Sequence, residues 1–112
     1  MVNKPSAIPY RPEDYLKTAE DITEYLNAAL DDGNEQVLLM ALRNVAKATG
    51  GMSKLSRQTG LSRESLYRLL SEDGNPRLSS LVAVLHSFGL SLAVRQDSHP
   101  YGTGSIQNRR LG

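Results

Sequence analysis

Apolar residues recur every three or four positions along much of this chain, which is the spacing of one face of an α-helix. The first such face lies within residues 18–33 and consists of Ile22, Leu26, Ala29 and Leu30. Thr18 is followed three residues later by Asp21, a combination that caps the start of a helix, and Gly33 suits its end. The pattern therefore predicts a helix that buries this face.

A second amphipathic helix is predicted after Asn34, whose side chain can cap its first turn. Its inward face is expected to consist of Val37, Leu38, Ala41, Leu42 and Val45. The Gly50-Gly51 pair ends the pattern, because glycine readily terminates a helix and begins a turn.

Three shorter helices are predicted in the second half of the chain. They span residues 53–59, residues 62–70, where Ser62 caps the helix, and a segment that begins near Ser79. The sequence Asp-Gly-Asn-Pro at residues 73–76 has the composition of a loop and separates the last helix from the others. The last helix is expected to bury Leu81, Leu85 and Phe88. These patterns together predict an all-α protein with five helices.

The two ends of the chain follow other patterns. Residues 1–14 hold three of the five prolines and are expected to form an extended arm, whereas residues 97–112 are polar and are expected to be disordered. Before this tail, Leu90, Leu92 and Val94 alternate with other residues, as in a short β-strand. The chain itself contains no second strand with which this one could pair.

Residues 51–71 combine two helices of similar length with a turn that contains glycine. Gly60 can adopt the left-handed conformation that a tight turn requires, and Ser56 is small at the point where the two helices approach. The apolar positions at which two crossed helices would contact each other are Leu55, Leu61, Leu66 and Leu69 or Leu70. The pattern is that of a helix-turn-helix, whose second helix reads the major groove of DNA.

The second helix of this pair begins with polar and basic side chains, as the reading of base edges requires. The residues expected to read bases are Arg63, Glu64, Ser65, Tyr67 and Arg68. Arg63 can donate two hydrogen bonds to guanine, and Glu64 can accept one from cytosine. The residues expected to hold the DNA backbone are Lys54, Arg57, Ser62 and Arg77. Similar helix pairs occur in proteins that bind no DNA, so a pure protein-interaction module is the alternative.

Charge is divided unevenly along the chain, although the net charge is only +1. Residues 13–36 hold eight acids and one lysine, whereas residues 37–94 hold seven Lys or Arg residues and three acids. We therefore expect two surfaces with different partners, of which the basic surface faces an anion.

Composition excludes several kinds of site. The chain has 112 residues, enough for one domain, and contains no cysteine, which excludes disulfides and thiolate chemistry. His86 and His99 are its only histidines, and we expect no metal and no cofactor. The serines lack a histidine and an acid at a recognisable spacing, so we expect no enzyme. No apolar run suits a membrane span or a signal peptide, which predicts a cytoplasmic protein.

The run from Tyr15 to Leu92 resembles the addiction-module antidote family, HigA-like antitoxins with a Cro/C1 (lambda repressor-like) helix-turn-helix. The matching segments are residues 14–17, 22–29, 41–48, 60–70 and 75–77, followed by Leu85, Phe88, Gly89 and Leu90. The resemblance implies a compact five-helix DNA-binding domain over residues 15–96 and adds Ser53 to the expected backbone contacts. Ser56 stands where the family more often has alanine, a change that costs little if its hydroxyl bonds back to the helix.

The resemblance also implies a function, which is that of the antitoxin of a type II toxin–antitoxin module. Such a protein represses its own operon as a homodimer on operator DNA and neutralises a RelE/HigB-like ribonuclease toxin by direct contact. The predicted strand of Leu90, Leu92 and Val94 is expected to pair with its twin in the dimer. Pairing with a toxin sheet and folding back on the last helix are the alternatives.

The sequence leaves two points open. The toxin-binding surface is unknown, and both the acidic helix at residues 18–31 and the proline-rich arm are candidates. The alternative function is a stand-alone repressor of the prophage type, which binds DNA and has no toxin partner.

Overall fold

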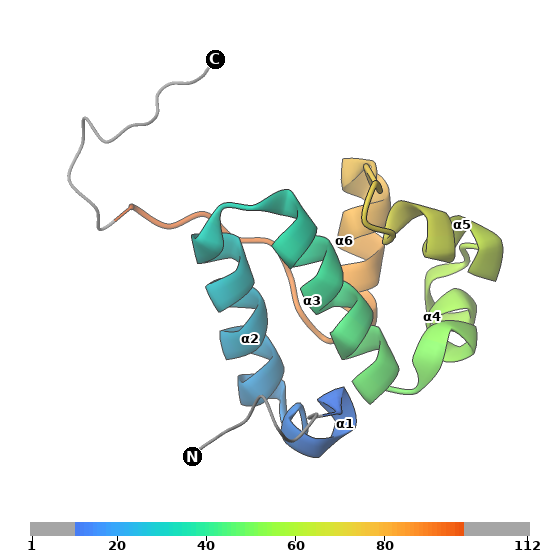
Figure 1. Cartoon of the computed structure of the whole chain (residues 1–112), viewed down its shortest axis with the longest axis horizontal. Helices are drawn as coiled ribbons and strands as arrows, with labels where there is room; N and C mark the ends of the chain where they lie inside the picture. Colours follow the sequence, from blue (N-terminus) through green and yellow to red (C-terminus); the bar gives the residue numbers. More distant parts are fainter. Residues whose placement is uncertain (1–10, 98–112) are drawn as a thin grey trace.

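A computed structural model of the chain describes residues 11–97. In this range the fold is entirely helical, which confirms the predicted all-α class. The helices are α1 (Pro12–Tyr15), α2 (Ala19–Asp32), α3 (Glu35–Ala48), α4 (Gly51–Thr59), α5 (Arg63–Leu69) and α6 (Leu78–Ser87). Figure 1 shows α2 and α3 side by side, with α4, α5 and α6 on the opposite side of α3 from α2.

Helices α2 and α3 begin at the capping residues that the sequence predicts. The Thr18 hydroxyl accepts a hydrogen bond from the Asp21 amide at 3.0 Å, and the Asp21 carboxylate accepts one from the Thr18 amide at 3.0 Å. The Asp21 carboxylate also accepts from the Lys17 amide at 3.0 Å, and these backbone donors lower the pKa of Asp21. Asn34 caps α3 by accepting from the Gln36 amide at 2.8 Å.

The predicted apolar face of α2 is correct in three of its four positions. Ile22, Leu26 and Ala29 are buried, but the side chain of Leu30 is 54% exposed. Leu30 lies one residue beyond the buried stripe and faces a shallow hollow that Leu92 also lines. The sequence pattern includes Leu30 because its spacing is helical, although the segment at residues 90–95 covers it only in part.

The hydrophobic core is built around α3, which packs against α1, α2 and α4. The side chains that are almost completely buried are Leu42, Val45, Leu66, Leu70 and Val84. On α3, Leu39 and Ala46 are buried as well, whereas the predicted Val37 and Leu38 are only half-buried. Helix α6 buries Val84 most deeply, and its predicted face is half-buried at Leu81, Leu85 and Phe88.

The structure adds one helix to the five that the sequence predicts. Residues 12–14, predicted to end the extended arm, belong to the short helix α1, in which Pro12 is buried. Proline is well placed at the first position of a helix, because its fixed φ fits and its missing amide proton would have no partner there. Arg11 and Asp14 add an ion pair of 3.6 Å. The rest of the predicted arm, residues 1–10, lies outside the described residues.

The predicted strand at residues 90–96 is wrong for the single chain, because the described residues contain no strand. A strand requires a hydrogen-bonding partner, and nothing between residues 11 and 97 supplies one. The segment instead passes beside α2, where Arg95 Nη2 lies 3.4 Å from Asp31 Oδ1. Val94 is fully exposed, and Leu92 is half-exposed. The predicted disordered tail lies outside the described residues from residue 98 onward.

No helix in the described part of the chain is both long enough and apolar enough to span a membrane.

Candidate nucleic-acid interface

The predicted helix-turn-helix region contains two helices, α4 and α5, joined by residues 60–62. Gly60 has φ +80° and ends α4 in the left-handed conformation expected of the turn. Ser56 does not bond back to its own helix; its hydroxyl donates to the Leu61 carbonyl at 2.5 Å. The Leu61 amide in turn donates to the Thr59 hydroxyl at 3.1 Å. These bonds fix the turn from both sides, so α4 and α5 form one unit.

Three leucines anchor this unit in the core. Leu55 of α4 and Leu66 of α5 are buried, and so is Leu70 at the carboxyl end of α5, as the sequence predicts. Leu61 and Leu69 are half-buried and pack against the same core. Because the inward face of α5 is held by apolar contacts, its opposite face is free to carry polar and charged groups.

The outward face of α5 carries the charged and aromatic side chains proposed to read bases. Arg63, Glu64, Tyr67 and Arg68 are all exposed, and the side chain of Tyr67 is exposed by 54%. Their spacing of three and four residues places Glu64, Tyr67 and Arg68 on one face of the helix. An arginine, a carboxylate and an aromatic hydroxyl are thereby presented together on one short rigid element.

Ser62 and Ser65 are used mainly to start α5. The Ser62 hydroxyl accepts from the Ser65 amide at 3.0 Å and donates to the Ser65 hydroxyl at 2.9 Å. Ser62 is therefore the helix cap, as predicted, and Ser65 is half-buried behind it. The remaining residues predicted to contact the DNA backbone are exposed: Ser53, Lys54 and Arg57 on α4 and Arg77 before α6.

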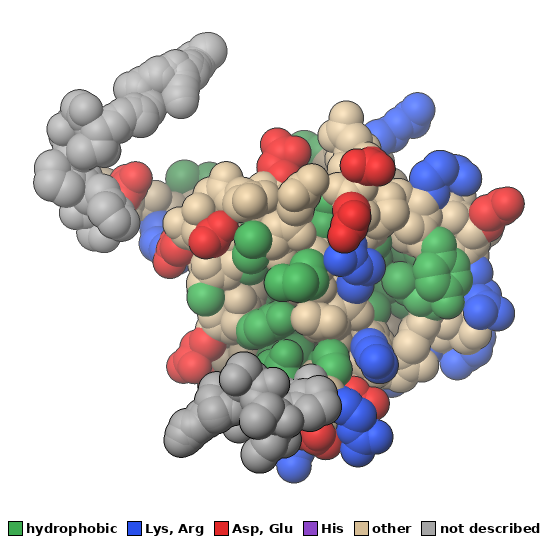
Figure 2. All heavy atoms as spheres, viewed as in Figure 1, with side chains coloured by type: hydrophobic (Ala, Val, Ile, Leu, Met, Phe, Trp, Pro, Cys, Tyr) green, Lys and Arg blue, Asp and Glu red, His purple; other side chains and the backbone are tan. Residues whose placement is uncertain are grey.

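The charges of this region are predominantly basic. Residues 51–71 contain Lys54, Arg57, Arg63 and Arg68 against the single acid Glu64. Figure 2 shows Lys and Arg side chains gathered at the end of the molecule that α4 and α5 form. A surface of this kind attracts a polyanion such as nucleic acid through many weak, salt-dependent contacts.

Arg43 is a functional candidate that the sequence interpretation missed. It lies on α3, is half-buried, and its guanidinium donates a hydrogen bond to the Leu70 carbonyl at the carboxyl end of α5. The last carbonyls of a helix carry partial negative charge and lack partners within the helix, so a cation there satisfies both needs. Arg43 therefore fixes the end of α5 against α3. No local sequence pattern indicates this hydrogen bond, because Arg43 and Leu70 are 27 residues apart.

At the same end of α5, Gly74 lies too close to the helix backbone to be replaced by a residue with a side chain. A Cβ atom at this position would lie 2.2 Å from the Leu69 carbonyl oxygen and 3.0 Å from the Ser71 carbonyl oxygen. The Gly74 amide donates to the Ser71 carbonyl at 2.9 Å. Only glycine allows the loop after α5 to pass this close to the helix backbone.

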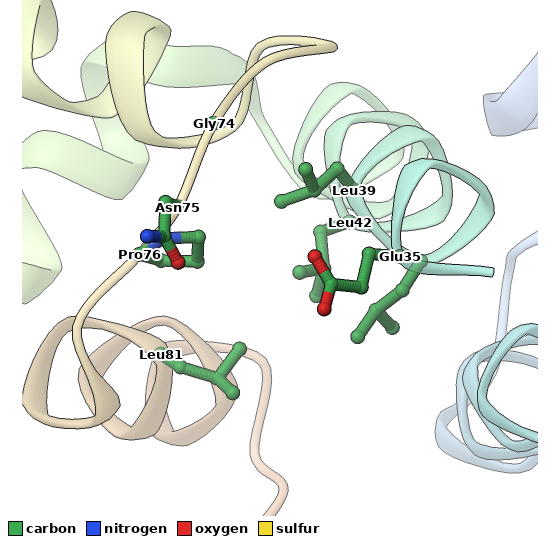
Figure 3. A pocket seen from close by; sticks show the side chains of 8 residues that line it. Glu35, Leu39, Leu42, Gly74, Asn75, Pro76 and Leu81 are labelled. Carbon is green, nitrogen blue, oxygen red and sulfur yellow. The ribbon is translucent and has the colours of Figure 1, made fainter. Parts of the chain in front are cut away.

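A hollow of about 220 Å³ lies beyond this loop, between α3 and α6. Figure 3 shows the Glu35 carboxylate beside Leu39 and Leu42 of α3, facing Pro76 of the loop and Leu81 of α6. Glu35 is the one ionisable side chain among the residues that line this hollow, which therefore holds no pair of groups for acid–base chemistry. In the described residues, no three His, Cys, Asp or Glu side chains are grouped so that they could hold a metal ion.

Comparison with known proteins identifies the family. The family described as "Probable addiction module antidote protein" matches residues 7–96. The chain belongs to this family. The chain is also 37% identical over 83 residues to an uncharacterized protein of Haemophilus influenzae, a match that covers 74% of this chain and 84% of the relative. No solved structure matches the chain significantly. Membership of an antidote family implies a toxin partner.

Proposed function

We propose that this protein is the antitoxin of a type II toxin–antitoxin module. It binds its own operator DNA as a homodimer and represses the operon, and it neutralises a RelE/HigB-like ribonuclease toxin by direct contact. The observation that carries the DNA-binding half is the outward face of α5, which presents exposed arginines on a helix held at both of its ends. The family supports the toxin-binding half.

The proposal assigns different tasks to the two groups of exposed residues. Arg63, Glu64, Tyr67 and Arg68 read base edges, because they share the outward face of α5. Ser65 contributes least to reading, since it is half-buried and its hydroxyl is engaged by Ser62. The residues that hold the phosphate backbone are Ser53, Lys54, Arg57, Ser62 and Arg77. No cofactor or metal takes part in this function.

The homodimer supplies two recognition helices, since one helix reads too few base pairs to define an operator. Residues 90–96 are the proposed dimer element. Leu92 and Val94 are exposed apolar side chains, and the backbone of the segment has no strand partner within the described residues. Such a segment is suited to pair with a second copy of itself across a two-fold axis.

The first test measures binding of the purified chain to the DNA upstream of its own gene by fluorescence anisotropy, at several salt concentrations. If a dimer neutralises roughly six to eight phosphates, affinity falls by roughly 10³- to 10⁴-fold between 50 and 200 mM salt. The chain is also co-expressed with the product of the neighbouring gene, and the mass of the complex is determined.

The two alternative functions give different results in these experiments. A stand-alone prophage-type repressor binds the DNA with the same salt dependence but forms no stable complex with a neighbouring product. A pure interaction module shows a flat salt response and no preference for the upstream DNA. A mixed complex together with steep salt dependence is the result that the antitoxin proposal requires.

A further inference from the structure

A second surface with the character of an interface lies on the pair of helices opposite the α4–α5 unit. Its apolar centre is formed by Tyr25 and Ala28 of α2 and by Val37 and Met40 of α3, around a hollow of about 200 Å³ that Asp32 also lines. Figure 2 shows hydrophobic side chains gathered over α2 and α3. These five residues are referred to below as the α2–α3 face.

The apolar centre of the α2–α3 face is accessible. The side chain of Met40 is 45% exposed, and Tyr25 and Val37 are half-buried. A methionine at this position gives a flexible, polarizable contact, and methionine and aromatic side chains are enriched where proteins bind each other. Exposure of the Met40 side chain to water is unfavourable in free energy. A pair of helices that served only as scaffold would not need an apolar side chain at this position.

The aromatic part of the α2–α3 face is held in place before any partner binds. The Asn44 amide of α3 donates a hydrogen bond to the Tyr25 hydroxyl at 2.8 Å. The ring of Tyr15 packs edge-on against that of Tyr25, with ring centroids 5.9 Å apart. A side chain that is already ordered loses little conformational entropy on binding, which favours its use as an anchor.

Acidic side chains border this apolar centre. Asp21, Glu24, Ala28 and Asp32 follow one another at intervals of three and four residues and so form one row along α2. Asp21 is engaged by backbone amides. Within residues 11–97, no cation pairs with Glu24 or Asp32. Glu24 and Asp32 therefore present uncompensated negative charge next to exposed apolar surface.

The charge of this border specifies the chemistry of its partner. A ribonuclease must present a basic surface to its substrate, because RNA is a polyanion. An apolar centre with an acidic border complements such a surface by excluding water at the middle and attracting cations at the edge. We infer that the α2–α3 face binds the basic, RNA-contacting surface of the toxin, an inference that rests on the proposed function.

The position of the α2–α3 face has a consequence for the assembly. Figure 1 shows α2 at one end of the molecule and the α4–α5 unit at the other. Toxin on the acidic end and DNA on the basic end therefore occupy separate surfaces. The toxin-bound protein is expected to bind operator DNA as a ternary complex.

The inference is tested with two variants of the full chain, each measured against the co-expressed and then separated product of the neighbouring gene. Met40→Asp removes the apolar anchor and is expected to weaken binding by at least about tenfold, mainly through faster dissociation. Glu24→Lys combined with Asp32→Lys reverses the border and is expected to slow association about tenfold and to abolish its salt dependence.

Matched controls separate this surface from the DNA-binding surface. Arg63→Ala is expected to bind the toxin like the wild type, whereas the two α2–α3 variants are expected to bind operator DNA like the wild type. Because Glu24 and Asp32 are exposed, the charge-reversed variant is expected to fold. It therefore tests the inference even if Met40→Asp does not fold.

Failure of the inference and failure of the proposed function give different results. If the wild-type chain binds no product of a neighbouring gene, the proposed function is wrong and the inference is wrong with it. If the wild type binds and both variants bind as tightly, only the inference is wrong. If the variants turn a dimer into a monomer and still bind the toxin, the α2–α3 face joins two copies of this chain, and the inference is also wrong.

Discussion

Arg63 and Lys54 are both exposed basic side chains of the α4–α5 unit. The proposed function gives them different tasks on DNA. Arg63→Ala removes a side chain that reads a base edge, so it is expected to cost about 1–3 kcal/mol on the operator and to relax sequence preference. Lys54→Ala removes a phosphate contact and is expected to weaken operator and random DNA alike. Anisotropy titrations with an operator duplex and a scrambled duplex measure both effects. Equal losses for both variants on both duplexes would contradict the assignment.

Arg43 allows a second prediction, because it contacts the carboxyl end of α5 but does not lie on the outward face of that helix. Arg43→Met keeps the apolar stem and leaves the Leu70 carbonyl without its donor, at a cost of about 1–3 kcal/mol in the free energy of unfolding. Operator affinity is expected to fall as well, since the end of α5 is no longer fixed. Urea unfolding and DNA titration at 10 °C measure the two losses.

The matched control for Arg43 is Lys47→Met, which removes an exposed cation from the same helix. It is expected to leave stability and DNA affinity nearly unchanged. An Arg43 variant as stable as this control would show that the bond to Leu70 contributes nothing.

Asp21, at the start of α2, makes the free energy of unfolding depend on pH. Backbone amides lower the pKa of its carboxyl in the folded state, so the stabilisation is present above the unfolded pKa. It is lost as pH falls through the lowered folded pKa. Asp21→Asn is therefore expected to destabilise the fold at pH 7 and to approach wild-type stability in strong acid.

Thermal unfolding of Asp21→Asn from pH 7 downward checks this behaviour. Glu20→Gln serves as its control, because Glu20 lies in the same first turn but accepts none of these backbone bonds in the described structure. A stability difference for Asp21→Asn that stays constant down to pH 2 would exclude charge as the cause.

The position of α5 in the α4–α5 unit is fixed by hydrogen bonds that reach it or its turn from other parts of the fold. Ser56 bonds across the turn to Leu61, and Arg43 reaches α5 from α3. These contacts limit the movement of the outward face relative to the core. A recognition helix held in this way loses less entropy on binding DNA than one that is free to tilt.

In the whole molecule, residues 90–96 have no strand partner among the described residues, and we expect them to form the dimer contact. Val94→Asp places a charge where two copies are proposed to pair and is expected to shift the mass in solution from dimer to monomer. Operator affinity is expected to fall sharply, since one recognition helix remains per particle. Size-exclusion chromatography with light scattering measures the mass.

Met40→Asp is the matched control for the dimer, because it also replaces an exposed apolar side chain with a carboxylate. It is expected to remain dimeric. A Val94→Asp variant that stays dimeric would place the dimer contact elsewhere on the molecule.

The sequence by itself determined five of the six helices in the described residues. Thr18 with Asp21, Asn34 and Ser62 each cap the helix that they were predicted to cap, and Gly60 ends α4 as expected. These signals are reliable because the interacting groups lie within five residues, so the local sequence contains the whole interaction. The short helix α1 was missed because Pro5, Pro9 and Pro12, which lie before it and at its first position, suggested an extended arm.

The tertiary structure decided which surfaces remain exposed and what holds them. Leu30 fits the helical spacing of its neighbours but lies outside the core, and the bond from Arg43 to Leu70 spans 27 residues. The strand pattern at residues 90–96 is local, yet a strand forms only where another backbone is present. Burial and long-range hydrogen bonds depend on how helices pack, and periodicity along one helix does not contain that information.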